Sequence, residues 1–402
     1  MSAPDGTSPA EVTTVAELVG RTVAGLGVSH AFGLIGSGNF DVSNALTRAG
    51  AAFVPARHEM GAVVMADAYS KVTGRVAVVT LHQGCGLTNA VTGIAEAAKS
   101  RTPLLVLAAD TARAAVGSNF RIDQDSLVRS VGAVAERVHG PTSAADDIRR
   151  AHWQAVEGRR TVVVSLPTDV QAAVAQDQPT PATMAPLLPP RPNAAVVSQV
   201  ADLLLAARSP VIVAGRGARG QRAVIERLGE LTGAVLTTTA VARGLFTGSP
   251  WSVDVCGGFS SPTGARLISS GDVVIGLGAA LNMWTTRHGG LLRDASTLIQ
   301  VDLDTEAIGA HHPVGVGVVA DVGEAAAALV AELEDRGGSS GHRRTPQLAA
   351  EIAAGAWPLE PYEDASTDGA LDPRTLSIVL DRVLPAERTV VVDSGHLSLI
   401  HI

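Results

Sequence analysis

Glu59 is the residue whose type and position best fit catalytic chemistry. It lies between residues 50–57, which have the pattern of a short strand, and residues 60–73, where apolar or small residues recur at helical spacing. We therefore expect the carboxylate at a strand-to-helix junction, among apolar neighbours that limit its hydration. Such a carboxylate is suited to sharing a proton with a ligand. The alternative is an ordinary first-turn glutamate, which the helix dipole favours.

A second polar group follows the next expected strand, at residues 75–81. His82 and Gln83 come directly after it, and Gly84 and Gly86 follow, where missing side chains let a ligand approach the backbone. His82 can act there as a proton donor or acceptor, or it can simply end a strand. Asn89 opens the next expected helix, and it is equally an ordinary helix-start residue.

A third loop joins an expected strand at residues 30–35 to an expected helix at residues 41–49. It contains Gly36 and Ser37 in the run GSGN, and a glycine loop that opens a helix is a weak indication of an anion site.

The elements that must position these residues alternate regularly. Residues 12–173 predict further strands at 104–109 and 161–166 and a helix at 15–26. Residues 194–335 form a second such block, with strands expected at 211–214, 235–238, 273–277 and 297–301. Alternation of this kind predicts an α/β fold with two doubly wound parallel-sheet domains. In the second block, Gly215, Arg216 and Gly217 follow a strand and could admit a phosphate, and Asp302 could contact a ribose.

The remaining segments are predicted to be connections and ends. Residues 1–11 read as a disordered tail, 174–193 as a Pro- and Ala-rich linker, and 336–370 as a second linker. Residues 371–396 predict the start of a third α/β domain, with a helix at 374–383 and a strand at 389–392. We expect this domain to be truncated, and residues 397–402 to be a tail that is not native.

Composition excludes several classes of protein. The chain has 402 residues, of which 46% are hydrophobic and 3% aromatic, so its cores must be aliphatic. A net charge of −8 without a basic stripe argues against nucleic acid as a partner. The cysteines, Cys85 and Cys256, predict neither a disulfide framework nor a zinc site. We expect a cytoplasmic protein without a membrane span.

The motifs together resemble the thiamine-diphosphate-dependent enzymes of the acetolactate synthase, 2-oxoacid decarboxylase and pyruvate oxidase superfamily. The matching segments are residues 27–46, 57–79, 82–110, 165–171, 209–218, 236–246, 269–279 and 299–309. The resemblance implies that Glu59 hydrogen-bonds the aminopyrimidine ring of the coenzyme, that Asn89 supports that ring, and that the loop with Gly36 and Ser37 lines the cleft. Phe120 and Gln124 fall near a segment that contacts substrate in a neighbouring subunit of such enzymes, and a simple packing role is the alternative for Phe120.

The resemblance also implies partners. The family holds the diphosphate through Mg²⁺, bound by a Gly-Asp-Gly motif and a later Asn that this sequence lacks, so no metal ligand is assigned. Family members carry FAD, ADP or nothing in the central domain, and residues 278–284 depart from the pattern of the FAD-binding members. Sites shared between subunits imply a homodimer or homotetramer.

The resemblance implies decarboxylation of a small 2-oxoacid with carboligation, as in acetolactate synthases, with a truncated chain that is inactive alone. Leu81 and His82 match some aryl 2-oxoacid decarboxylases, so non-oxidative decarboxylation of the benzoylformate type is an alternative. The missing metal motif leaves a third alternative, a non-catalytic nucleotide-binding pseudoenzyme.

Overall fold

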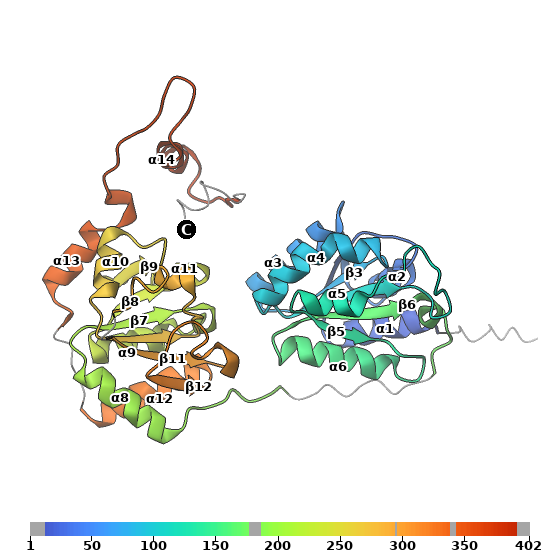
Figure 1. Cartoon of the computed structure of the whole chain (residues 1–402), viewed down its shortest axis with the longest axis horizontal. Coiled ribbons are helices and arrows are strands. Elements are labelled where there is room, and N and C mark those ends of the chain that lie inside the picture. Colours follow the sequence, from blue (N-terminus) through green and yellow to red (C-terminus); the bar gives the residue numbers. More distant parts are fainter. Residues whose placement is uncertain (1–12, 177–185, 294–295, 338–342, 392–402) are drawn as a thin grey trace, which may run out of the picture. The chain divides into compact units, whose positions relative to one another are not determined.

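The computed structural model describes residues 13–176, 186–293, 296–337 and 343–391. The chain divides into two compact units, the first up to Leu187 and the second from Leu188, and each has its own sheet (Figure 1). This division falls within residues 174–193, the segment predicted as a linker. The tails predicted at residues 1–11 and 397–402 lie outside the described residues, as does part of the predicted linker.

The first unit is a six-stranded sheet in the order β2-β1-β3-β4-β6-β5, with every neighbouring pair parallel. Helices α1, α2 and α6 pack together around one apolar cluster, and α3 and α4 around another. The bounds are β1 His30–Gly33, β2 Ala52–Pro55, β3 Ala77–Leu81, β4 Leu104–Asp110, β5 Val134–Arg137, β6 Thr161–Pro167, α1 Val15–Gly25, α2 Phe40–Arg48, α3 Glu59–Thr73, α4 Cys85–Lys99, α5 Gln124–Ser130, α6 Ala144–Val156 and α7 Thr168–Gln171.

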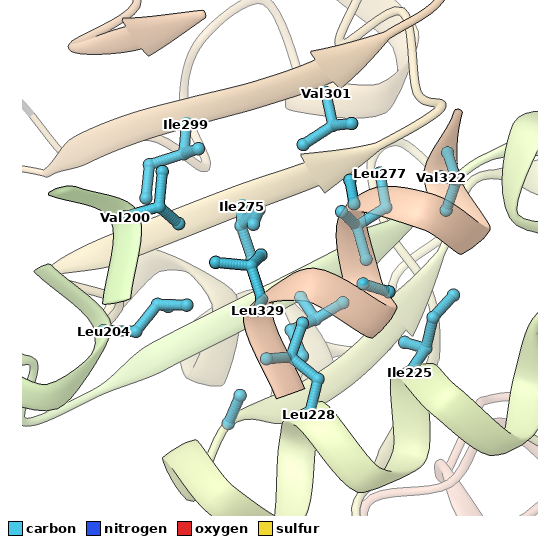
Figure 2. Close-up of a cluster of buried hydrophobic side chains, with 14 of the residues drawn as sticks. Val200, Leu204, Ile225, Leu228, Ile275, Leu277, Ile299, Val301, Val322 and Leu329 are labelled. Atoms are coloured by element: carbon cyan, nitrogen blue, oxygen red, sulfur yellow. The ribbon is translucent and has the colours of Figure 1, made fainter. Parts of the chain in front are cut away.

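The second unit is also six-stranded and parallel, in the order β12-β11-β10-β7-β8-β9. Figure 2 shows Val200 and Leu204 of α8, Ile225 and Leu228 of α9, and Leu329 of α12 in the core of this unit. The bounds are β7 Pro210–Ala214, β8 Val235–Thr238, β9 Ser252–Val255, β10 Val273–Leu277, β11 Thr297–Asp302, β12 Val316–Val319, α8 Ala194–Ala206, α9 Arg222–Thr232, α10 Pro262–Ser269, α11 Met283–Thr286 and α12 Val322–Asp335. The prediction of two doubly wound parallel sheets is confirmed.

The strands that sequence did not predict lie at sheet edges. β9 and β12 alternate buried and less buried residues, and β5 is partly exposed throughout. The predicted strands β3, β7, β8 and β10 are buried along their whole length and therefore read as apolar runs. Edge strands lack that signal because one side of each meets no neighbouring strand.

Part of the second predicted linker packs on the second unit. The guanidinium of Arg344 donates to the carbonyl oxygen of Ala234 at 2.7 and 3.0 Å and lies over the ring of Trp251, and burial lowers its pKa to about 10. Arg343 donates to the carbonyl oxygens of Pro210 and Leu267. These contacts attach helix α13, Pro346–Ala354, to the unit.

The third predicted unit is only partly formed. Helix α14 spans Pro373–Val383, close to its predicted range, but none of its residues is buried. The strand predicted at 389–392 is absent at residues 389–391, and Val392 lies outside the described residues. A strand needs a neighbour for its backbone hydrogen bonds, and no described strand pairs with this segment.

Asn39 shapes the loop that follows β1. Its side chain is fully buried, and its Oδ1 accepts from the amide of Gly36 at 2.8 Å. Its Nδ2 donates to the carbonyl oxygen of Leu34 at 3.1 Å and to Oγ1 of Thr80 at 3.2 Å. The Thr80 hydroxyl is also hydrogen-bonded to Ser43 at 2.9 Å, so one network joins β1, α2 and β3. This network sets the path of residues 36–38.

Replacing Asn39 with Ala should destabilise the first unit by about 2–4 kcal/mol, because buried polar groups lose their partners. Asn44→Ala on α2, the helix that follows Asn39, is the matched control, because the side chain of Asn44 is only half-buried. Hydrogen exchange at β1 and β3, followed by mass spectrometry on the full chain, measures the effect. Equal exchange in the two variants would contradict the role given to Asn39.

Candidate active site

The candidate site lies at the carboxyl ends of β1 and β3. These strands are neighbours, with β2 beyond β1 and β4 beyond β3, so the chain order reverses between them. Open α/β sheets bind ligands at such reversals, because the loops leaving the two strands turn to opposite faces. Residues 36–39 follow β1 here, and residues 82–84 follow β3. The loops singled out from sequence are therefore brought together.

Glu59 is the first residue of α3, and its carboxylate is mostly buried, with 8% of the residue exposed. Asn89 of α4 donates from Nδ2 to Oε2 of Glu59 at 3.1 Å. Within the described part of the chain this is the only hydrogen bond to that carboxylate, and no Arg or Lys pairs with it. A buried carboxylate is costly to dehydrate when it has so little compensation. Oε1 of Glu59 thus has no hydrogen-bond donor among the described residues.

His82 lies beside this carboxylate, at the end of β3. The main-chain amide of Gly38 donates to its Nδ1 at 3.1 Å, and its ring meets the edge of Phe120 at a centroid distance of 5.1 Å. Burial lowers the pKa of the imidazole, whereas the nearby negative charge of Glu59 acts to raise it. Of these two effects burial is the larger, so His82 is predominantly neutral near pH 7.

The glycines of the site let the backbone approach its neighbours more closely than a residue with a Cβ could. A Cβ on Gly86 would lie 3.0 Å from Cβ of His82 and 3.6 Å from Oε1 of Glu59. A Cβ on Gly36 would lie 3.0 Å from the ring of His82. Gly84 has a φ of 61°, which disfavours other residues, and a Cβ there would meet the Phe120 carbonyl. The close packing of these loops around Glu59 and His82 therefore depends on glycine.

The other predicted residues are placed differently. Gln83 points away from solvent, with 9% exposed, and its Oε1 has no hydrogen-bond partner among the described residues. Ser37 is exposed on the β1 loop. Cys85, which opens α4, is exposed as a free thiol. The structure therefore groups Glu59, Asn89 and His82 closely, and leaves Gln83 beneath the loop of Gly38.

Two buried glutamines hold the loops of the site from below. Gln124 accepts from the amide of Gly84 at 3.0 Å and donates to the carbonyl oxygen of Ala109 at 3.1 Å. Gln171 donates to the carbonyl oxygen of Gly38 at 3.0 Å. Sequence reasoning did not find the role of Gln171, because its partner lies 133 residues away and no local pattern marks such a pair.

The second unit has its own reversal, between β7 and β10, and Gly215, Arg216 and Gly217 lie there. The amide of Gly215 donates to the carbonyl oxygen of Leu277 at 2.9 Å, and that of Gly217 to the carbonyl oxygen of Gly278 at 3.3 Å. The two loops touch so closely that a Cβ on Gly215 would overlap the carbonyl oxygen of Gly278. Both glycine amides therefore already have protein acceptors.

Asp302 ends β11 at the same edge of the second sheet. Its Oδ1 accepts from the amide of Asp304 at 3.0 Å, which is a local strand-end contact.

The described residues show neither a metal-binding cluster nor a membrane-spanning helix. The described residues contain no group of three or more His, Cys, Asp or Glu that could hold a metal ion. Among them, no helix has the length and apolarity that crossing a membrane requires.

Comparison with known proteins identifies the family of both units. Residues 13–130 match the thiamine pyrophosphate enzyme N-terminal TPP binding domain, and residues 197–329 match the thiamine pyrophosphate enzyme central domain. The first match contains Glu59, His82 and Asn89. The second contains the loops after β7 and β10.

The chain is also similar in sequence to several proteins of known or assigned activity. The chain is 30% identical to sulfoacetaldehyde acetyltransferase of Rhodobacter capsulatus over 335 residues, covering 81% of this chain and 56% of the relative. It is 29% identical to the probable 2-ketoarginine decarboxylase of Pseudomonas aeruginosa, covering 97% and 69%, and 26% identical to acetolactate synthase 2 of Nicotiana tabacum, covering 78% and 48%.

The chain spans 56% and 59% of the length of two sulfoacetaldehyde acetyltransferases that it matches, the second from Roseovarius nubinhibens. With both of its units matched in order, and a carboxylate, an amide and glycine loops gathered at one sheet edge, the chain belongs to the thiamine pyrophosphate-dependent enzyme family.

Proposed function

We propose that Glu59, supported by Asn89, binds the aminopyrimidine ring of thiamine diphosphate, and that the whole protein decarboxylates a 2-oxoacid and joins the remaining acyl fragment to an acceptor. The observation that carries the first part is the buried Glu59 carboxylate, whose one described partner is a neutral amide. A protonated ring nitrogen would supply the donor that this acceptor lacks.

The residues present fit this coenzyme. A Cβ on Gly86 would lie 3.6 Å from Oε1 of Glu59, so glycine keeps a side chain away from this oxygen. Oε1 has no hydrogen-bond partner among the described residues and can accept from a ring nitrogen. Thiamine diphosphate, when bound, supplies a nucleophilic carbon that attacks a carbonyl group. Its ring also takes up the electron pair that remains when carbon dioxide leaves.

Glu59 and Asn89 then have distinct tasks. Glu59 holds a proton between its oxygen and the ring nitrogen, which a partly dehydrated carboxylate does better than a fully hydrated one. Asn89 donates to Oε2 of Glu59, so Oε1 remains for the ring. Since Asn89 is on α4 and Glu59 on α3, packing between these helices sets the distance of the pair.

Acyl transfer to an acceptor is supported by the names of the relatives. They include sulfoacetaldehyde acetyltransferases and acetolactate synthases. Carboligation of the acetolactate synthase type is therefore our first proposal for the reaction class. Mg²⁺ is the proposed partner of the diphosphate, because it prefers phosphate and carboxylate oxygens.

Simple 2-oxoacid decarboxylation is the second candidate, favoured by His82. Its imidazole lies beside Glu59 and is only partly buried, so it can contact a substrate oxygen. A probable 2-ketoarginine decarboxylase is also among the relatives.

A homo-oligomer is proposed for the whole protein. Helix α3 exposes Met60, Val64, Met65 and Val72, at 40%, 48%, 36% and 85%. Apolar side chains along one helix next to the candidate site suit contact with a second copy.

Glu59→Gln should weaken the binding of thiamine diphosphate about 10- to 100-fold, because it removes a charged acceptor worth about 1.5–3 kcal/mol. Isothermal titration of the whole protein with thiamine diphosphate and Mg²⁺ measures this. Glu96→Gln, on the exposed side of α4, is the control and should bind like the wild type. Equal affinity in the Glu59 variant would refute the proposed site.

The same variant should lower the pKa of His82 further. The negative charge of Glu59 stabilises the imidazolium form, so its removal favours the neutral ring and moves the titration to lower pH. Proton NMR of the imidazole Cε1–H against pH follows this directly. An unchanged or raised pKa would show that the two side chains do not interact as the geometry indicates.

The two reaction classes separate by product. The whole protein with pyruvate, thiamine diphosphate and Mg²⁺ should release acetolactate or another acyl-transfer product when an acceptor is present. Chromatography of the products distinguishes this from acetaldehyde, which alone would favour the decarboxylase and contradict our first proposal.

A further inference from the structure

Only one nitrogen of the His82 ring is free to carry a proton in the neutral state. The main-chain amide of Gly38 donates to Nδ1 at 3.1 Å. A nitrogen that accepts a hydrogen bond bears no hydrogen, so the proton of the neutral imidazole is on Nε2. The contact joins residues 44 positions apart and therefore depends on the fold.

The donor is itself held firmly. The carbonyl oxygen of Gly38 accepts from Nε2 of Gln171 at 3.0 Å, and the next residue, Asn39, is completely buried. On the other side, Gln83 fills the position that a Gly38 side chain would take, since an ideal Cβ would overlap its Oε1. The Gly38 amide is thus fixed in direction by three neighbours.

We propose that Gly38 is a positioning residue that holds His82 as the Nε2–H tautomer, so that His82 presents a hydrogen-bond donor, and no basic nitrogen, to an oxygen of the bound substrate. The identity of that oxygen, on a 2-oxoacid, rests on the function proposed above. The tautomer itself rests only on this chain.

The surroundings of the ring agree with a neutral donor. An imidazolium would carry a second N–H directed at the N–H of Gly38, and two donors facing each other repel. Glu59 is the charged group that acts on the His82 ring, and it raises the pKa of the imidazole by less than burial lowers it. Gly36, Gly86 and Phe120, which also lie against the ring, bring no charge.

Nε2 is available for a ligand. Among the described residues it has no hydrogen-bond partner, and His82 is only partly buried. A donor of this kind binds carbonyl or carboxylate oxygens, which accept only. A base, in contrast, needs an unprotonated nitrogen that faces the substrate. The unprotonated nitrogen of His82 is Nδ1, and the Gly38 amide already donates to it. His82 therefore orients substrate and does not remove its protons.

Nitrogen-15 NMR tests the tautomer on the full chain without ligand. With ¹⁵N-labelled histidine, long-range proton–nitrogen spectra near pH 7.5 should show Nδ1 of His82 unprotonated and Nε2 protonated. His82→Gln assigns the signal by its disappearance. A protonated Nδ1, or rapid exchange between both tautomers, would overturn the proposal.

Gly38→Ala tests the cause. Its added methyl group would overlap Oε1 of Gln83 and lie 3.0 Å from Cβ of Ala109, which cannot turn aside, so we expect residues 36–38 to shift and the amide to leave Nδ1. We expect the tautomers to mix and the pKa of His82 to rise toward its ordinary value. Gly25→Ala, at the end of α1 with open space around it, is the control. An unchanged tautomer in Gly38→Ala would show that Gly38 does not set it.

This outcome is independent of the coenzyme. If the Nε2–H tautomer is found but the whole protein does not bind thiamine diphosphate, the role of Gly38 stands and the proposed function is rejected. If the whole protein binds the coenzyme but the proton is on Nδ1, the role of Gly38 is rejected and the proposed function stands.

Discussion

The candidate site depends on one largely buried carboxylate that has few hydrogen-bond partners. Glu59 begins α3, and Asn89, which donates to Oε2, is its one hydrogen-bond partner in the described chain. Proteins seldom leave a buried polar oxygen without a donor unless water or a ligand supplies it. Beside this carboxylate, Gly86 brings no side chain and His82 is a neutral ring, so Oε1 remains for a ligand.

Much of this arrangement could be predicted from sequence, for a physical reason. Strands β3, β7, β8 and β10 are buried on both faces, so they appear as short apolar runs. Glycines mark the turns after several of these strands, and apolar or small residues at helical spacing mark helices. Parallel strands bring their carboxyl ends to one edge, which places Glu59, His82 and Asn89 near one another once the alternation is recognised.

The remainder depends on contacts between distant residues. Nothing local to Gln171 indicates that it supports Gly38, and nothing local to Arg343 or Arg344 indicates that both bind carbonyl oxygens of the second unit. Edge strands such as β5 and β9 were missed because exposure on one side removes their apolar pattern. The glycine run after β7 matched a phosphate loop in sequence, yet its amides bond to the end of β10 and the loop after it, which only the fold can show.

The central claim is that Glu59 shares a proton with the aminopyrimidine ring of thiamine diphosphate. Nitrogen-15 NMR of coenzyme labelled at the ring nitrogen opposite the exocyclic amine measures that proton directly. When the labelled coenzyme is added to the whole protein with Mg²⁺, we predict that this nitrogen becomes protonated at a pH where the free coenzyme is not, and that Glu59→Gln abolishes the change. A bound ring nitrogen that remains unprotonated in the wild type would contradict the account.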